Sequence, residues 1–341
     1  MQPVTLKRLA QELSLSIGTV SRALNDSYDI SPATKERVRA LAKELNYDPN
    51  PYAGSLRHHK SRTIGVIVPE VANPFFALVI NGVEEVARQN NYHVLIYLTH
   101  EDCQREAELV RLLAGGRVDG ILLSVASTCA QFEHLRVLAE RHIPLVLFDR
   151  VREDIPGPQV TTDDFNSSYR ATRHLLDHGC RVIAHQTISE QLTIGQRRKQ
   201  GYLAALCDFG IEPEAGLVVT AQPTKEQDVT LLEALLRQRP DIDGIFASTE
   251  RLALSSYAAC NNLGRRIGTD AKIIGFSNLD AAPFLNPALT TITQPAYDMG
   301  REAAAILFQA VTRNRPLSEA QSVELKSELL VRASTVPPTP A

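Results

Sequence analysis

Small polar side chains and one arginine recur at helical spacing near the start of this 341-residue chain. Residues 17–24 are predicted to form a short helix whose outward face could recognise the edges of DNA bases. Arg22 can donate two hydrogen bonds to a guanine, Ser21 can bond a phosphate or a base, and Ile17 can pack on a thymine methyl group. Gly18 lets the backbone approach the floor of a groove. The face comprises Ser16, Ile17, Gly18, Ser21 and Arg22, with Asn25 just beyond the helix.

A second set of polar and aromatic residues follows predicted strands later in the chain. Asp149-Arg150 ends one strand, and two rings follow another in the segment Asn73-Pro74-Phe75-Phe76. Rings can stack on the apolar face of a small polar ligand while charged groups fix its hydroxyls. Plainer roles are also open, with Phe75 and Phe76 as core and Asp149 as a helix cap or salt-bridge partner. The other segments of this set are Thr249-Glu250, Ser277-Asn278 and residues 196–202, which open a predicted helix.

Motifs of enzyme and metal chemistry are missing from the sequence. No GxGxxG, GxxxxGK[ST] or GxSxG pattern occurs, and none of the nine histidines falls in HExxH. His174 and His178 lie four residues apart on a predicted helix and could hold a metal together. Because no further ligands accompany them, we interpret the pair as a solvated helix face. We therefore expect no catalytic residues, no metal and no cofactor.

The five cysteines are odd in number and widely scattered, and no two form a CxxC pair. This pattern argues against a disulfide framework and against a structural zinc site. Buried free thiols are expected at Cys103, Cys129, Cys180, Cys207 and Cys260.

Three short helices are predicted to position the first group of residues. Thr5 and Ser16 are placed to cap the first two helices, and Ser31-Pro32 begins a third that runs to about Leu45. Two short helices joined by a tight turn at Ser14-Leu15, with a third behind them, form a helix-turn-helix unit. The second helix of such a unit fits the major groove of DNA. The alternative is a three-helix bundle with solvated polar faces.

The charge of the chain is unevenly distributed. Residues 1–62 contain ten Lys and Arg against six Asp and Glu, a net charge of +4, whereas the remainder has 26 basic and 33 acidic residues, a net charge of −7. A small basic head on an acidic body indicates binding to a polyanion, with nucleic acid the first candidate. No apolar run suits a transmembrane helix, and the N-terminus lacks an apolar signal segment, so we expect a cytoplasmic protein.

From Thr63 onward, predicted strands alternate with helices. The strands are continuous apolar runs, which are typical of parallel sheets covered by helices on both faces. About ten such units are too many for one small sheet, so we predict an α/β body of two lobes, each with a doubly wound parallel sheet. Ligands of such sheets bind beyond the carboxyl ends of the strands, where the second set of residues lies. The predicted strands are 63–69, 92–99, 118–124, 143–149, 182–188, 217–221, 244–248 and 272–276.

Four segments of the first fifty residues form a distinctive series: 4–10 (VTLKRLA), 16–25 (SIGTVSRALN), 31–34 (SPAT) and 47–50 (YDPN). In this order and spacing they resemble the headpiece of the LacI/GalR family of bacterial transcription regulators. Two positions depart from the family pattern, since Ser14 replaces a glycine in the turn and Arg8 replaces a common acidic residue. The resemblance implies DNA contacts from Thr5, Ser16, Ile17, Gly18, Thr19, Ser21, Arg22, Asn25, Tyr47 and Asn50.

Residues 48–62 contain Pro49, Pro51 and a basic run, and by composition they form a flexible tether. The family resemblance implies instead a hinge helix over residues 50–56 that orders on operator DNA. In that arrangement Ala53 contacts DNA and Leu56 inserts into the minor groove, where an apolar wedge can unstack a central base step. Gly54 stands where the family usually has arginine, which removes a phosphate contact.

The resemblance continues along the whole chain, in PFF at 74–76, LFD at 147–149, RRKQGY at 197–202, IIGFSN at 273–278 and PALTTITQP at 287–295. It implies a cleft between the lobes for a small effector. Sugar-binding members often carry Asp at the position of Ser277 and Asn-Asp at Thr249-Glu250. A serine cannot hold two hydroxyls as an ionised carboxylate would, so the effector stays open. The implied effector-binding residues are Phe75, Phe76, Asp149, Arg198, Thr249 and Ser277.

These features predict a DNA-binding transcription regulator, a repressor, that acts as a homodimer on palindromic operator DNA. A small, carbohydrate-like metabolite between the lobes would switch it. The alternative is a cytoplasmic sugar-binding protein without a DNA function. The helix over 297–311 is expected to pack on the first lobe. The predicted domains are a headpiece at 1–47, a hinge at 48–61, a first lobe at 62–161 plus about 293–325, and a second lobe at 162–292 plus about 326–336.

Overall fold

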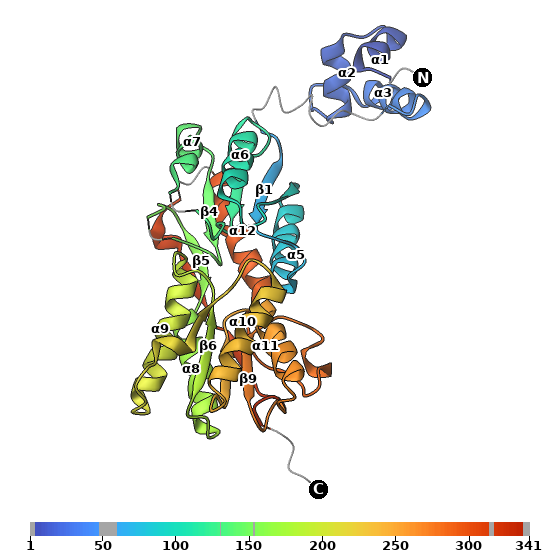
Figure 1. Ribbon diagram of the computed structural model, residues 1–341. Helices are drawn as coiled ribbons and strands as arrows, with labels where there is room; N and C mark the ends of the chain where they lie inside the picture. The colour runs from blue at the N-terminus through green and yellow to red at the C-terminus, as the bar shows by residue number, and fades with distance from the viewer. Residues whose placement is uncertain (1–3, 48–59, 130, 153, 314–316, 337–341) are drawn as a thin grey trace. The chain divides into compact units, whose positions relative to one another are not determined.

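The computed structural model describes residues 4–47, 60–129, 131–152, 154–313 and 317–336 (Figure 1). The chain divides into two compact units, residues 1–61 and 62–341, and each is described by itself. Among the described helices, none combines the length and the apolar character that crossing a membrane requires.

The first unit contains the three helices predicted for a helix-turn-helix unit. Each helix starts at its predicted cap, because the side chains of Thr5, Ser16 and Ser31 each accept a hydrogen bond from the backbone N–H three residues on. The small core consists of residues such as Leu9, Val20 and Val38, which are fully buried. The helices are α1 (Leu6–Leu13), α2 (Ile17–Leu24) and α3 (Pro32–Glu44).

The turn between α1 and α2 takes the backbone geometry that glycine usually supplies. Ser14 has φ 54° and ψ 41°, in the left-handed region. Its N–H and that of Leu15 donate to carbonyl groups in the last turns of α1, so the turn satisfies the end of the helix. Serine thus accepts the conformation at the modest cost that a Cβ atom brings there.

The second unit contains two six-stranded sheets with equivalent strand orders, which confirms the predicted α/β class. The first sheet runs β11-β5-β4-β3-β1-β2 and the second β12-β10-β9-β8-β6-β7. Neighbouring strands are parallel except β10 and β12, which are antiparallel. The strands of the first sheet are β1 (Thr63–Val68), β2 (His93–Leu98), β3 (Gly120–Leu123), β4 (Leu145–Phe148), β5 (Gln159–Thr162) and β11 (Val323–Leu325). Those of the second are β6 (Ile183–Thr187), β7 (Val218–Thr220), β8 (Gly244–Ala247), β9 (Lys272–Phe276), β10 (Thr290–Thr293) and β12 (Glu328–Leu330).

Helices cover both faces of each sheet, and separate apolar cores lie between the layers. The chain passes from one sheet to the other three times, after β5, after β10 and between β11 and β12. The first sheet is accompanied by α5 (Pro74–Gln89), α6 (Cys103–Ala114), α7 (Arg136–Glu140) and α12 (Ala296–Arg313). The second is accompanied by α8 (Asp164–Asp177), α9 (Thr193–Asp208), α10 (Lys225–Gln238) and α11 (Glu250–Asn262).

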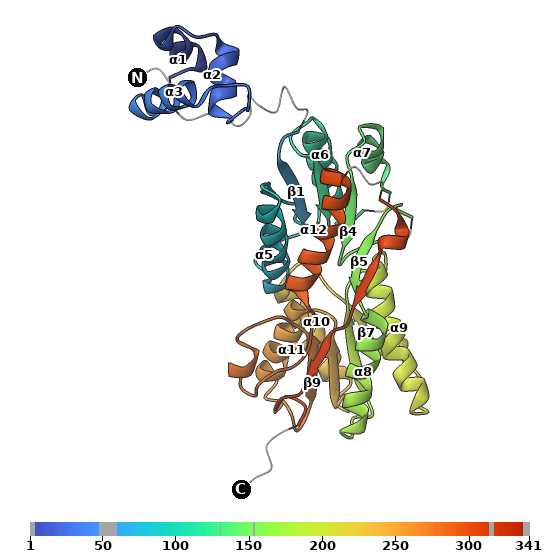
Figure 2. The same ribbon diagram turned by 180° about the vertical axis from the view of Figure 1, so that it is seen from behind.

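As predicted, helix α12 returns to the first sheet. It lies beside α5, and both views show the pair (Figures 1 and 2). Two glycines allow the close approach. A Cβ atom on Gly300 would lie 2.0 Å from the carbonyl oxygen of Val79, and one on Gly82 would lie 2.1 Å from that of Tyr297. The backbones of the two helices therefore touch at a point where no side chain fits.

Gly300→Ala is expected to destabilise the second unit by about 2–3 kcal/mol, because the helices must move apart to admit one methyl group. Urea unfolding monitored by circular dichroism measures this loss. The matched control is Gly216→Ala, where a Cβ atom would meet nothing within 4 Å. Equal free energies of unfolding for the two variants would show that α5 and α12 can move apart at little cost.

The histidine pair of α8 is not the solvated face that we predicted. His174 is only 8% exposed, and its Nε2 lies 2.8 Å from Oγ1 of Thr335. His178 Nδ1 lies 2.7 Å from the carbonyl oxygen of His174. Burial lowers the pKa of His174 to about 4. The prediction failed because the covering segment lies 161 residues along the chain, beyond the reach of helical periodicity.

The prediction of five buried free thiols is also wrong. Cys103 and Cys129 form a disulfide, with Cα atoms 4.9 Å apart. Cys180 and Cys260 are free and buried, whereas Cys207 is free and exposed. The bonded pair comes from the start of α6 and the segment after β3, which the sheet brings together although they are 26 residues apart.

Candidate functional site

The predicted DNA-contacting residues of the first unit gather on and around α2. Val20 and Ala23 are fully buried on one side of this helix. On the other side the large apolar side chain of Ile17 is 46% exposed. Ser16, Arg22 and Asn25 are exposed as well, while Gly18, Thr19 and Ser21 are half-buried. Thr5 is exposed at the cap of α1, Tyr47 is half-buried after α3, and Asn50, Ala53 and Leu56 lie outside the described residues.

Local hydrogen bonds occupy several of these polar groups. Thr19 Oγ1 lies 2.8 Å from Ser16 Oγ, and Asn25 Nδ2 donates to the carbonyl oxygen of Ser21 at 2.9 Å. Arg22 Nη1 lies 2.5 Å from Oδ2 of Asp29. Water screens this exposed ion pair, so the guanidinium can exchange its partner for a base edge or a phosphate.

One exposed residue near α2 escaped the sequence prediction. Tyr28, between α2 and α3, is 99% exposed, so its ring packs on none of the described residues of this unit. A phenol in that position can donate to a phosphate. An aromatic residue within the polar segment 25–31 is the signal that could have identified it.

The second unit contains a cavity of about 420 Å³, its open mouth included. It lies where strands of both sheets end, and every predicted effector-binding residue lines it. From the first sheet's side come Phe75, Phe76 and Asp149, and from the second come Arg198, Thr249 and Ser277. The remaining lining residues are Asn73, Arg150, Ile188, Ile194, Glu250, Phe276, Asn278 and Gln294.

The aromatic wall is fixed by the start of α5. Asn73 caps this helix, its side-chain oxygen accepting from the N–H of Phe75 at 3.0 Å, and Pro74 occupies the first turn. The rings of Phe75 and Phe76 meet edge to face, with centroids 5.2 Å apart. Both side chains are buried in the core and also line the cavity.

Arg198 is the central cation of the cavity. It lies in the second turn of α9, because this helix begins at Thr193 rather than at the predicted residue 196. Its side chain is only 2% exposed, and its Nε donates to Oδ1 of Asp164 at 2.7 Å. Its Nη1 donates to the carbonyl oxygen of Ser248, and the guanidinium stacks 3.6 Å from the ring centroid of Phe276.

One donor of Arg198 is left over. Its Nη2 is buried, yet it has no hydrogen-bond partner within the part of the chain that the structure describes. Buried donors without a partner are costly, since they give up water and gain nothing in return. Because Arg198 lines the cavity, its Nη2 is suited to donate a hydrogen bond to an oxygen atom of a ligand.

Two buried carboxyl groups accompany this arginine. Asp149 lines the cavity and Asp164 holds Nε of Arg198. Burial raises the pKa of Asp149 above its usual range and that of Asp164 to about 6, although the charge of Arg198 partly opposes both shifts. Since a carboxylate accepts and a carboxylic acid also donates, these groups can bond hydroxyls in either state.

The carboxylate that Ser277 lacks is supplied by its neighbour. Ser277 Oγ donates to Oε2 of Glu250 at 2.8 Å and accepts from the N–H of Leu279 at 3.1 Å. Glu250 occupies the first turn of α11, whose cap is Thr249. Burial raises the pKa of Glu250 above its usual range. The Ser277–Glu250 pair therefore presents an acidic group at the edge where the resembled family often has Asp.

Comparisons with known proteins identify the family of both units. Residues 5–50 match the model described as bacterial regulatory proteins, lacI family, and residues 61–328 match periplasmic binding proteins and sugar binding domain of LacI family. The chain is 33% identical over 332 residues to the ribose operon repressor of Halalkalibacterium halodurans, covering 97% of each protein.

Solved structures of transcription regulators resemble this chain along nearly its whole length. A complex of the transcriptional regulator CelR with cellobiose is 29% identical, with a TM-score of 0.73 over 97% of this chain and 99% of that one. The Lac repressor dimer bound to operator and an anti-inducer shares the fold, with a TM-score of 0.85 at 22% identity over 98% of this chain and 100% of that one. The chain therefore belongs to the LacI family of bacterial regulatory proteins and is a DNA-binding transcription regulator.

Proposed function

We propose that this regulator is a cytoplasmic repressor that binds a palindromic operator as a homodimer. Two heads related by a two-fold axis read two half-sites of opposite direction, which is why a palindrome is expected. In each head, Arg22, Ser21 and Ile17 on α2 would contact base edges. Thr5, Ser16, Thr19 and Asn25 would contact the backbone or flanking bases, together with Gly18, Tyr47 and the hinge residues Asn50, Ala53 and Leu56.

We infer that the effector is a small carbohydrate or sugar derivative bound in the cavity of the second unit. The unpartnered Nη2 of Arg198 and the acidic groups of Asp149 and Glu250 are suited to hydroxyl groups. Phe75 and Phe76 offer an apolar wall for the face of a sugar ring. The names of two relatives, a ribose repressor and a cellobiose complex, support the same ligand class. The cavity is proposed to bind its ligand without turnover.

Switching would follow from closure of the two lobes, which we assign to residues 62–161 plus about 293–325 and residues 162–292 plus about 326–336. The chain crosses between the sheets three times, so a rotation of one lobe against the other moves all three crossings at once. An effector bound to both lobes favours one closure angle. Coupling of this kind is typically worth about 1–3 kcal/mol in operator affinity.

The observation that carries the proposal is the presence, in one chain, of the exposed polar face of α2 and a cavity lined by a buried arginine with one unpartnered donor, Nη2. Selection of bound duplexes from a random pool, followed by binding measurements at several salt concentrations, tests it. A palindromic consensus and a steep fall of affinity with salt are expected.

Addition of ribose or cellobiose should then change the affinity for the selected duplex. A protein that binds a sugar but enriches no duplex would be the alternative, a sugar-binding protein without a DNA function. Conversion of the added sugar, followed by chromatography, would contradict the assignment as a protein without enzymatic activity.

A further inference from the structure

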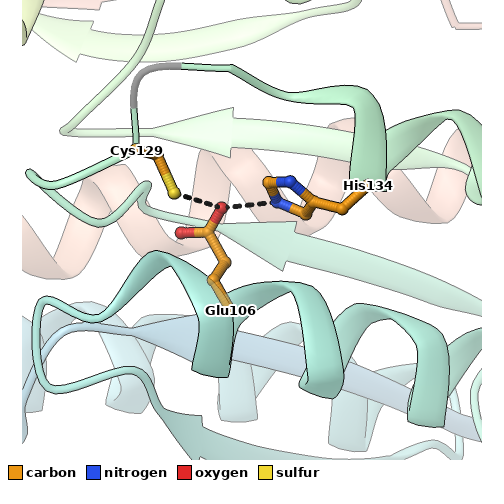
Figure 3. A group of neighbouring side chains, drawn as sticks. All are labelled: Glu106, Cys129 and His134. Carbon is orange, nitrogen blue, oxygen red and sulfur yellow. Dashed lines mark hydrogen bonds and ion pairs between the residues drawn. The ribbon is translucent and has the colours of Figure 1, made fainter.

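A group of ligating side chains lies outside the cavity and has no part in the proposed function. The ligand atoms of Glu106, Cys129 and His134 all lie within 4.8 Å of one another, and the sulfur and the ring nitrogen both face one oxygen of Glu106 (Figure 3). His134 Nε2 lies 2.8 Å from Oε1 of Glu106, and Cys129 Sγ lies 3.7 Å from the same oxygen. Cys103, bonded to Cys129, brings a second sulfur to this group.

Three elements hold these residues in place. Cys103 is the first residue of α6 and Glu106 lies three residues on, so both side chains share one face of that helix. Cys129 comes from the segment after β3, and His134 from the 3₁₀ turn Glu133–Leu135 that precedes α7. Glu106 is also anchored, because its Oε2 accepts from the N–H of Ala126 at 2.7 Å.

The three ligating side chains are almost completely buried. Glu106 is fully buried, Cys129 is 2% exposed, and the side chain of His134 is 7% exposed. The N–H of Ala126 and the ring of His134 hold the two oxygens of Glu106 in this state, and a metal ion could take the place of the hydrogen bond with His134. Two sulfurs, an imidazole nitrogen and a carboxylate oxygen form a ligand set that suits tetrahedral zinc.

We propose that, when the disulfide is reduced, Cys103, Cys129, Glu106 and His134 bind one zinc ion. Reduction by a dithiol transfers two electrons and two protons, opens the Cys103–Cys129 bond and leaves the reductant as a disulfide. Binding of Zn²⁺ then releases two protons from the thiols. Disulfides are rare in reducing compartments, so the dithiol state is the one expected where a DNA-binding regulator acts.

His134 Nε2 and Glu106 Oε1, now 2.8 Å apart at hydrogen-bond distance, must separate to about 3.3 Å to share a tetrahedral zinc. Zinc–sulfur bonds of about 2.3 Å place two sulfurs of a tetrahedral site about 3.8 Å apart, so the sulfurs must separate once their bond is broken. Cys103 is half-buried at the end of a helix, where a small shift is possible. The present spacing of 3.7 Å between Cys129 Sγ and Glu106 Oε1 already fits two ligands on one tetrahedral zinc, which lie about 3.5 Å apart.

Zinc titration of the reduced full-length protein, in competition with a chromophoric chelator, tests the proposal. One tightly bound zinc per chain is expected after reduction with a phosphine, and none after oxidation to the disulfide. Cobalt in place of zinc should give the visible absorption bands of a tetrahedral site with thiolate ligands. Comparing the two redox states of the unmodified protein avoids any variant that fails to fold.

Variants then assign the ligands. Cys129→Ser and His134→Asn should each weaken zinc binding at least tenfold, whereas Cys207→Ser, which changes an exposed free cysteine, should leave it unchanged. Thermal unfolding should shift upward with zinc only in the reduced protein, because an ion that binds the folded state stabilises it. Equal zinc binding by reduced and oxidised protein, or loss of binding in Cys207→Ser, would overturn the proposal.

Discussion

Replacing Arg198 with methionine is expected to abolish the response to a sugar effector. The guanidinium is the buried cation of the cavity, and its Nη2 is the donor left for a ligand. A hydrogen bond to a charged group contributes about 1.5–3 kcal/mol, so at least a tenfold to hundredfold loss of affinity is expected. Calorimetric titration with ribose and with cellobiose measures it, using the sugar that binds the unmodified protein.

The single variant has a second effect that must be separated from the first. It leaves Asp164 buried without its partner at 2.7 Å, which typically costs about 3–5 kcal/mol of folding free energy. The double variant Arg198→Met/Asp164→Leu removes both charges, so we expect it to regain most of that stability in urea unfolding. Effector binding should stay lost in the double variant. Recovery of sugar binding together with stability would show that Arg198 only supports the fold.

The most accurate predictions from the sequence were the helices and strands whose capping residues and apolar periodicity lie within one short segment. The bounds of α2 (Ile17–Leu24) and β9 (Lys272–Phe276) were predicted to the residue, because each has a clear start and a run of apolar residues in the right period. The strands β5, β10, β11 and β12 were missed. They are three or four residues long and rich in Thr and Glu, so no apolar run marks them.

The sequence predicted which residues line the cavity, but not the hydrogen bonds and ion pairs that hold them in place. The loops after the strands gave the lining residues, since the carboxyl ends of parallel strands bind ligands. Asp164, Phe276 and Gln294 were missed, because their importance comes from contacts with residues far along the chain. Asp164 bonds Arg198, which lies 34 residues further along the chain. Gln294 Nε2 donates to Thr162 Oγ1, and these two residues are 132 positions apart in the sequence. The same limit explains the missed disulfide and the buried His174.

Arg22→Ala is expected to lower operator affinity by roughly a hundredfold and to relax the selected sequence at one base pair of each half-site. Each bidentate contact of an arginine with guanine gives about 1–3 kcal/mol of discrimination, and a dimer loses two such contacts. The fall of affinity with salt should keep most of its slope, because a base contact releases few counterions. Duplex selection and fluorescence anisotropy at several salt concentrations measure both effects.

The ion pair with Asp29 provides the matched control. Arg22 must leave this carboxylate, now 2.5 Å from its Nη1, before it can bind a base. Asp29→Asn removes the competing charge on the same surface and keeps the size of the side chain. We expect this variant to bind the operator as tightly as the unmodified protein, or more tightly, with the same consensus. If Arg22→Ala enriched that consensus unchanged, Arg22 would be a surface partner of Asp29 and the base contacts would have to come from other residues of α2.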